Sequence, residues 1–117
     1  MSRPEMPIFT RVFDLLTWLV PATNHFPRAQ RFTITKRLLD AAFDLSEHLE
    51  EANQRRGQAR LERLNLADEA LGKVRFYLRL VYRWHWLNPG QYEHAARMVD
   101  EIGRLLGGWK KATIRSG

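Results

Sequence analysis

The chain has 117 residues, of which 44% are hydrophobic and 27% charged, an ordinary composition for a globular protein that buries a core. Lys and Arg number 19 against 13 Asp and Glu, and fifteen of the cations are Arg, so the formal net charge is +6. This cationic excess favours a polyanionic partner. The absence of Cys excludes disulfides, thiolate metal sites and a cysteine nucleophile. With no signal peptide and no membrane-spanning run, we expect a cytoplasmic protein without membrane contact.

The first half of the chain predicts two helices. Apolar residues recur at helical spacing throughout, and no run alternates strongly enough to predict a strand. The first helix is expected over residues 7–22, with Pro7 in its first turn, followed by a connector over residues 24–31. The second is expected over residues 33–53 with Thr33 as N-cap. Its outer side carries a row of acids: Asp40, Asp44, Glu47 and Glu51.

The second half predicts two longer helices, over residues 58–86 and 89–109. Asn88 can cap the fourth helix, Pro89 suits its first position, and Gln91 can complete a capping box. The basic tail, residues 110–117, is expected to fray. Short connections between four amphipathic helices predict an all-α fold, an antiparallel up-and-down four-helix bundle that forms a single domain over residues 1–117.

The end of the third helix, KVRFYLRLVYRWHW (residues 73–86), is apolar on two sides. Each helical residue advances about 100°. One stripe is therefore expected to face the core: Ala67, Leu71, Val74, Leu78, Val81 and His85. An arginine ridge follows at about 60° to 140° from Leu78, spaced by four residues: Arg75, Arg79 and Arg83. An aromatic face lies nearly opposite the core stripe, together with Lys73: Phe76, Tyr77, Leu80 and Trp84.

The aromatic face predicts a protein partner. A monomer would leave it in water, and soluble monomers rarely expose a contiguous apolar patch rimmed by charge. Self-association is the simplest candidate, so we expect a homo-oligomer. The alternative is that this face packs beneath the 24–31 connector or the C-terminal tail.

The arginine ridge has two interpretations. Arg75, Arg79 and Arg83, with Lys73, can bind the phosphates of RNA or DNA. Alternatively, they pair with Asp40, Asp44 or Glu47 of the same or a neighbouring subunit, where exposed pairs would add at most about 1 kcal/mol each.

A second basic cluster opens the third helix: Arg55, Arg56, Arg60 and Arg63. The helical phase places Arg56, Arg60 and Arg63 toward the core, which buried guanidinium groups cannot tolerate. Either the helix overhangs the bundle there or its register changes. We include these three arginines among the candidate nucleic-acid-binding residues.

Two segments of the chain resemble a known family. FPRAQRFTITKRLLDAA (residues 26–42) and QYEHAARMVDEIGRLLGGWKK (residues 91–111) are similar to the four-helix-bundle family of the accessory variability determinant, which accompanies the reverse transcriptase of diversity-generating retroelements. The same family includes four-helix-bundle proteins encoded in intervening sequences of bacterial large-subunit ribosomal RNA genes.

The resemblance implies a function. It implies a basic homopentamer without catalytic activity that binds the reverse transcriptase and template RNA or RNA–DNA during mutagenic copying. The alternatives are a protein of the ribosomal intervening-sequence type and a structural interaction module that binds no nucleic acid.

No catalytic constellation stands out in the sequence. His25, His48, His85 and His94 are scattered, without a HExxH motif or a His-x-x-x-His pair. His85 lies on the core phase and is expected to be packed. Gly107 and Gly108 lack the pattern of a phosphate loop and are expected to permit a helix end or close packing. We therefore expect no enzymatic activity, no metal and no cofactor.

Overall fold

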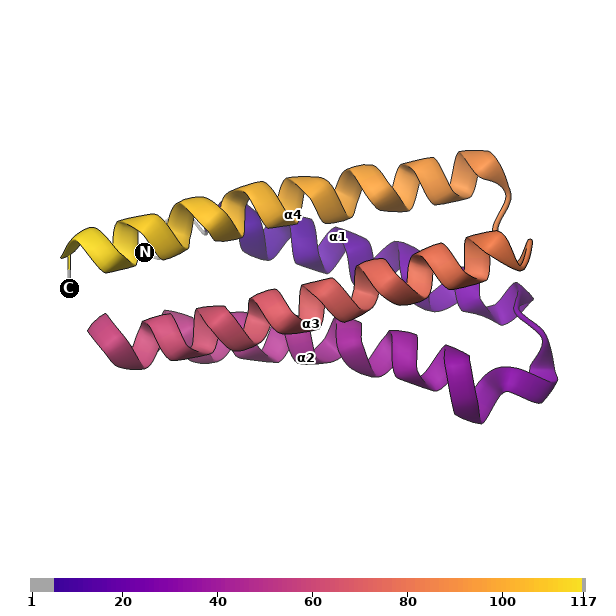
Figure 1. Cartoon of the computed structure of the whole chain (residues 1–117), viewed down its shortest axis with the longest axis horizontal. Coiled ribbons are helices and arrows are strands. Elements are labelled where there is room, and N and C mark those ends of the chain that lie inside the picture. The colour runs from indigo at the N-terminus through magenta and orange to yellow at the C-terminus, as the bar shows by residue number, and fades with distance from the viewer. Residues whose placement is uncertain (1–5, 117) are drawn as a thin grey trace, which may run out of the picture.

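The computed structural model of the chain describes residues 6–116 as a bundle of four helices (Figure 1). These are α1 (Pro7–Ala22), α2 (Lys36–Asn53), α3 (Gly57–Arg83) and α4 (Pro89–Ser116). Successive helices run in opposite directions, so the described residues form an up-and-down rod of 46 × 25 × 24 Å without a strand. This confirms the predicted fold class. Within residues 6–116, each helix is too short or too polar to cross a membrane.

The core forms where the four apolar stripes meet. The most completely buried side chains come from every helix: Ile8, Leu15, Leu19, Leu38, Leu45, Leu49, Leu64, Leu71, Val74, Leu78, Ile102 and Leu106. In α3, the predicted stripe is buried from Ala67 to Val81. Burial of each such side chain stabilises the fold by roughly 1.5–3 kcal/mol relative to exposure.

The segment between α1 and α2 is helical almost throughout, which corrects the predicted start of the second helix. Short 3-10 turns at Thr23–His25 and Arg28–Gln30 lead into one π-helical turn at Arg31–Thr35. Thr33 lies inside that turn, and its hydroxyl donates to Gln30 rather than capping a helix. The side chain of Phe26 is buried and fixes the connector to the bundle.

Helix α3 ends at Arg83, three residues before the predicted end at Trp86. His85 has a positive φ of 65°, the left-handed conformation of a helix C-terminal turn. The amide of Trp86 donates to the Val81 carbonyl at 2.8 Å, and that of His85 donates to Tyr82 at 3.0 Å. This hydrogen-bond pair is a Schellman motif. His85 is consequently exposed, and the expectation that it packs in the core is wrong.

Helix α4 begins as predicted but ends later. The amide of Asn88 donates to the Gln91 side chain at 2.9 Å, and the Gln91 amide donates to the Asn88 side chain at 2.8 Å, so the capping box is present. The helix then continues through Gly107 and Gly108 to Ser116. Residues 110–116 of the basic tail are therefore helical rather than frayed, because buried Trp109 and Thr113 hold their inner side against the bundle, and Gly117 lies outside the described residues.

Candidate nucleic-acid and partner surfaces

The arginine ridge lies along α3, beside α4. Arg75 reaches across to α4, where its Nη2 lies 3.6 Å from Oδ1 of Asp100. Gly103 leaves room for this crossing, since a Cβ at that position would stand 2.6 Å from the same Nη2. The acceptor of Arg75 is thus on α4, so the alternative interpretation that Arg75 pairs with the acidic row of α2 does not hold within one chain.

The other two ridge arginines differ from Arg75. Arg79 and Arg83 are exposed and form no ion pair with any other residue of the 6–116 segment. Of the α2 acids, Asp40 is bound by Lys36 of its own helix at 2.5 Å. Arg79 and Arg83 therefore present two unneutralised guanidinium groups to solvent, and Arg75 is partly neutralised.

Two tyrosines missed in the sequence lie beside the ridge. Tyr82 of α3 and Tyr92 of α4 stack with ring centres 4.2 Å apart and planes 6° from parallel. Arg75, Arg79 and Tyr92 line a hollow of about 200 Å³ between these helices. The signal was present in the chain, because Tyr82 follows Arg75 by seven residues and Arg79 by three, and so shares their side of the helix. Arginines beside aromatic rings are a common combination in single-stranded nucleic-acid sites.

The aromatic face is partly exposed. The exposed fractions of Phe76 and Trp84 are 48% and 43%, whereas Tyr77 packs against the core. Trp84 contacts Trp86 with ring centres 5.3 Å apart, and Trp86 in turn contacts Phe26 of the connector at 5.5 Å. The connector therefore covers the end of this face through Trp86, while Phe76 and Trp84 remain available to a partner.

Most arginines of the basic cluster at the start of α3 contact other residues of the bundle. The Nε of Arg60 donates to the Ala52 carbonyl at the end of α2, at 2.9 Å, and its guanidinium lies over the Trp109 ring. Arg55 donates to the Glu51 carbonyl at 3.0 Å, and Arg63 lies 3.9 Å from the Glu51 carboxylate. Arg56, which immediately precedes α3, is exposed. Lys73 is exposed as well, but it lies in the second half of α3, away from this cluster. Among the three candidates of this cluster, only Arg56 is therefore free of such contacts with residues 6–116.

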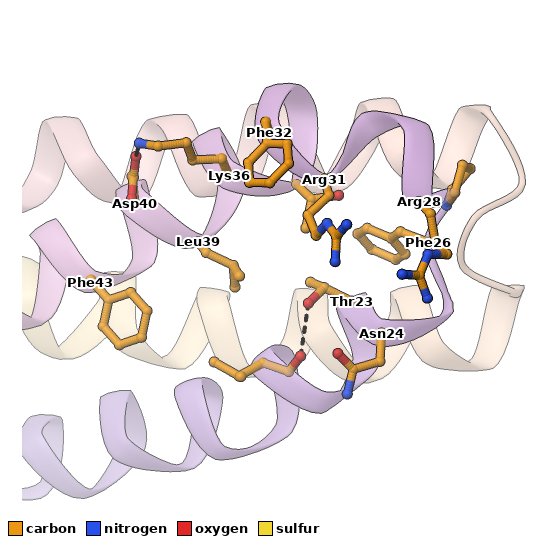
Figure 2. Close-up of a pocket in the computed structure, with 13 residues that line it drawn as sticks. Thr23, Asn24, Phe26, Arg28, Arg31, Phe32, Lys36, Leu39, Asp40 and Phe43 are labelled. Carbon is orange, nitrogen blue, oxygen red and sulfur yellow. Dashed lines mark hydrogen bonds and ion pairs between the residues drawn. The ribbon is translucent and has the colours of Figure 1, made fainter.

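A groove that sequence reasoning missed opens between the end of α1 and the start of α2. Its volume is about 550 Å³, and its lining includes Val20, Phe26, Arg31, Phe32, Leu39 and Phe43. Figure 2 shows Arg31 pointing into the space between the two helices, with Leu39 and Phe43 farther along α2. The available signal was the placement of Phe43 away from the core stripe of the predicted second helix, with Phe32 immediately before that helix.

The titratable groups of the described residues make local pairs. His48 hydrogen-bonds Glu51 at 2.9 Å, and this bond, together with the positive charges of Arg63 and Arg55, lowers the pKa of Glu51. Arg104 likewise lowers the pKa of Glu101 through a 2.7 Å hydrogen bond. Residues 6–116 contain no group of three or more His, Asp or Glu side chains placed to hold a metal ion. The prominent features are instead surfaces: a ridge of cations, an aromatic face and an apolar groove.

Comparisons with known proteins agree on this fold. One crystal structure, of a protein of unknown function from the S23 ribosomal protein family of Bacteroides thetaiotaomicron, superimposes with a TM-score of 0.80. The two sequences are 21% identical over 89% of this chain and 95% of that one, so the likeness is one of fold. No curated protein matches the sequence. The model of the bAvd-like family matches residues 6–113. The chain therefore belongs to the bAvd-like family.

Proposed function

We propose that this protein is a non-catalytic accessory component of a diversity-generating retroelement. In this role it forms a homo-oligomer, a pentamer by resemblance, and binds a reverse transcriptase together with RNA or RNA–DNA during mutagenic copying. Its family membership supports the general class of function. The observation that carries the nucleic-acid part is the unpaired state of Arg79 and Arg83 beside the stacked Tyr82–Tyr92 pair, within the described residues.

The ridge suits a backbone-directed mode of binding. Guanidinium groups spaced by one helical turn can each contact a phosphate and release its counterions. The tyrosine pair offers an aromatic surface on which a base can stack regardless of its sequence. Recognition would therefore depend on charge and strand form more than on base identity.

Fluorescence anisotropy with labelled single-stranded RNA and an RNA–DNA hybrid tests this proposal. Arg79→Glu/Arg83→Glu should weaken binding at least about tenfold. Arg97→Glu/Arg104→Glu removes the same charge from α4, where each arginine already pairs with a glutamate of its own helix, and should weaken binding far less. Circular dichroism verifies that both variants keep their helices. Equal losses in the two variants would show that net charge, not the ridge, determines binding.

The aromatic face supports the protein-partner part of the proposal. Phe76 and Trp84 expose nearly half of their surface beside the free cations. Light scattering should give a mass several times 13.8 kDa, and Phe76→Ser/Trp84→Ser should reduce it. A mass of one chain for the unaltered protein would contradict self-association.

A second candidate is a structural interaction module, of the ribosomal intervening-sequence type or otherwise, that binds proteins alone. The exposed apolar groove between α1 and α2 favours it. No binding of any RNA or DNA probe at low salt would select this candidate over the first.

A further inference from the structure

The edge of the bundle formed by α1 and α2 is unusually apolar for a solvent-facing surface. Four large side chains are exposed along it, namely Phe13 (71%), Val20 (39%), Phe32 (78%) and Phe43 (43%). They belong to neither the arginine ridge nor the aromatic face of α3. Contiguous exposed apolar surface of this kind marks an interaction site in soluble proteins.

This apolar edge continues beyond the groove of Figure 2. A second hollow, of about 190 Å³, lies farther along the same two helices and is lined by Phe9, Phe13 and Leu16 of α1 with Leu49 of α2. An α-helix rises 1.5 Å per residue, so the α1 side of the seam from Phe9 to Val20 extends roughly 16 Å, about three helical turns. A surface of this length matches a helical segment of a partner.

The charges along the seam are unequal at its two ends. At the connector end, Arg28 and Arg31 line the groove and form no ion pair with any described residue. Lys36, also at this end, is neutralised by Asp40. At the far end, Glu50 lines the second hollow. An occupant with acidic residues over Arg28 and Arg31 would be both apolar and electrostatically complementary.

We propose that the α1–α2 seam is the docking site for an amphipathic helix of another protein. The apolar stripe of that helix lies between Val20 and Phe43, and its acidic end meets Arg28 and Arg31. The interaction gives the proposed protein-partner function a location, and it is independent of nucleic-acid binding at the ridge.

Two other occupants fit less well. A nucleobase would leave polar edges facing an apolar wall of Val20, Leu39 and Phe43, which is costly without hydrogen-bond partners. A second copy of the chain that presented its aromatic face would offer Phe76 and Trp84 together with the cations Arg79 and Arg83 of the same helix end, and no acidic row. Such a surface does not complement the charges of Arg28 and Arg31.

Two synthetic helical peptides of about 14 residues test the proposal. Both carry leucines spaced by three and four residues. The positions that flank the leucines are Glu in the acidic peptide and Lys in the basic peptide. The acidic peptide should saturably shift the ¹H–¹⁵N resonances of Thr35, Leu39 and Phe43, and the basic peptide should bind at least about tenfold more weakly. Arg28→Glu/Arg31→Glu should reverse this preference. Arg97→Glu/Arg104→Glu on α4 should preserve it.

The contrary outcomes are distinct. Absence of a saturable shift, shifts centred on α3, or an unchanged peptide preference after the charge reversal would each overturn the docking site. A loss of RNA affinity in Arg28→Glu/Arg31→Glu as large as in Arg79→Glu/Arg83→Glu would identify the seam as a nucleic-acid surface instead. A fall in oligomer mass in Phe13→Ser/Phe43→Ser would assign it to a second copy. The RNA measurement on the ridge variants decides the nucleic-acid proposal separately.

Discussion

The guanidinium carbon of Arg60 lies 5.6 Å from the centre of the Trp109 ring, while its Nε donates to the Ala52 carbonyl at 2.9 Å. One side chain thus joins three helices, since Ala52 lies in the last turn of α2, Arg60 in the first turn of α3 and Trp109 in the C-terminal half of α4. The positive charge of Arg60 interacts favourably with the carbonyl groups at the C-terminal end of α2 and with the face of the Trp109 indole ring.

Arg60 is therefore expected to stabilise the bundle. Arg60→Ala should lower the free energy of unfolding by about 1–2 kcal/mol, through the lost hydrogen bond and the lost stacking on Trp109. Urea denaturation followed by circular dichroism measures the change. Exposed Arg56 provides the control, and Arg56→Ala should stay within about 0.5 kcal/mol of the unaltered protein. Equal stability of the two variants would refute the structural role of Arg60.

His85 should be a site of avoidable strain. Its φ of 65° favours glycine, and His85→Gly should raise the free energy of unfolding by about 1 kcal/mol. Lys73→Gly, inside α3, should lower it by about 1 kcal/mol, because there glycine adds only conformational entropy to the unfolded chain. Thermal and urea denaturation of both variants measure the two effects. A destabilised His85→Gly variant would show that the imidazole makes a contribution that outweighs the strain.

Two buried threonines should respond oppositely to loss of the hydroxyl. The Thr35 Oγ1 is buried and has no hydrogen-bond partner among the described residues, whereas the Thr113 hydroxyl donates to the Trp109 carbonyl at 2.8 Å. Thr35→Val should therefore raise the free energy of unfolding by about 1 kcal/mol. Thr113→Val should lower it by about 0.5–1 kcal/mol. Urea denaturation compares them, and a loss of stability in Thr35→Val would mean that the hydroxyl is satisfied in solution.

The pair of His48 and Glu51 should make stability depend on pH in the acidic range. The His48 hydrogen bond, with Arg63 and Arg55, lowers the pKa of Glu51, so the folded protein binds fewer protons at this site than the unfolded chain. Its contribution is present above the ordinary Glu pKa and is lost as the pH falls through the lowered value.

Urea denaturation across the acidic range measures this contribution. The stability difference between the unaltered protein and Glu51→Gln should be largest near neutral pH and should shrink toward about pH 3. Glu47→Gln, at an exposed position without an ion pair in the described segment, should show no such trend. A Glu51→Gln difference that is constant with pH would contradict the coupling.

The fold followed from sequence patterns that act locally. The spacing of Leu71, Val74 and Leu78 alone identifies the buried side of α3, and Asn88 with Gln91 identifies the start of α4. The end of α3 could not be predicted in this way. A helix commonly ends at a glycine in the left-handed conformation, whereas here that position is occupied by His85. The predicted end of the fourth helix at residue 109 was wrong in the opposite sense, since the packing of Trp109 and Thr113 keeps the chain helical as far as Ser116.

The candidate site was predictable only in part. Helical phase places Arg75, Arg79 and Arg83 on one ridge, but it cannot show that Arg75 crosses to Asp100 on another helix. The same phase calculation put Arg60 toward the core without revealing Ala52 and Trp109 as its partners. Contacts between helices depend on their packing, which a single helical projection does not contain.

The salt dependence of RNA affinity, measured on the unaltered protein and on Arg79→Ala/Arg83→Ala, addresses the ridge itself. Each lost phosphate contact to a single strand should reduce the slope of log K against log salt by about 0.7, so the double variant should have a slope smaller by roughly 1.4. Arg97→Ala/Arg104→Ala should keep the slope of the unaltered protein. An unchanged slope in Arg79→Ala/Arg83→Ala would show that these guanidinium groups do not contact phosphate.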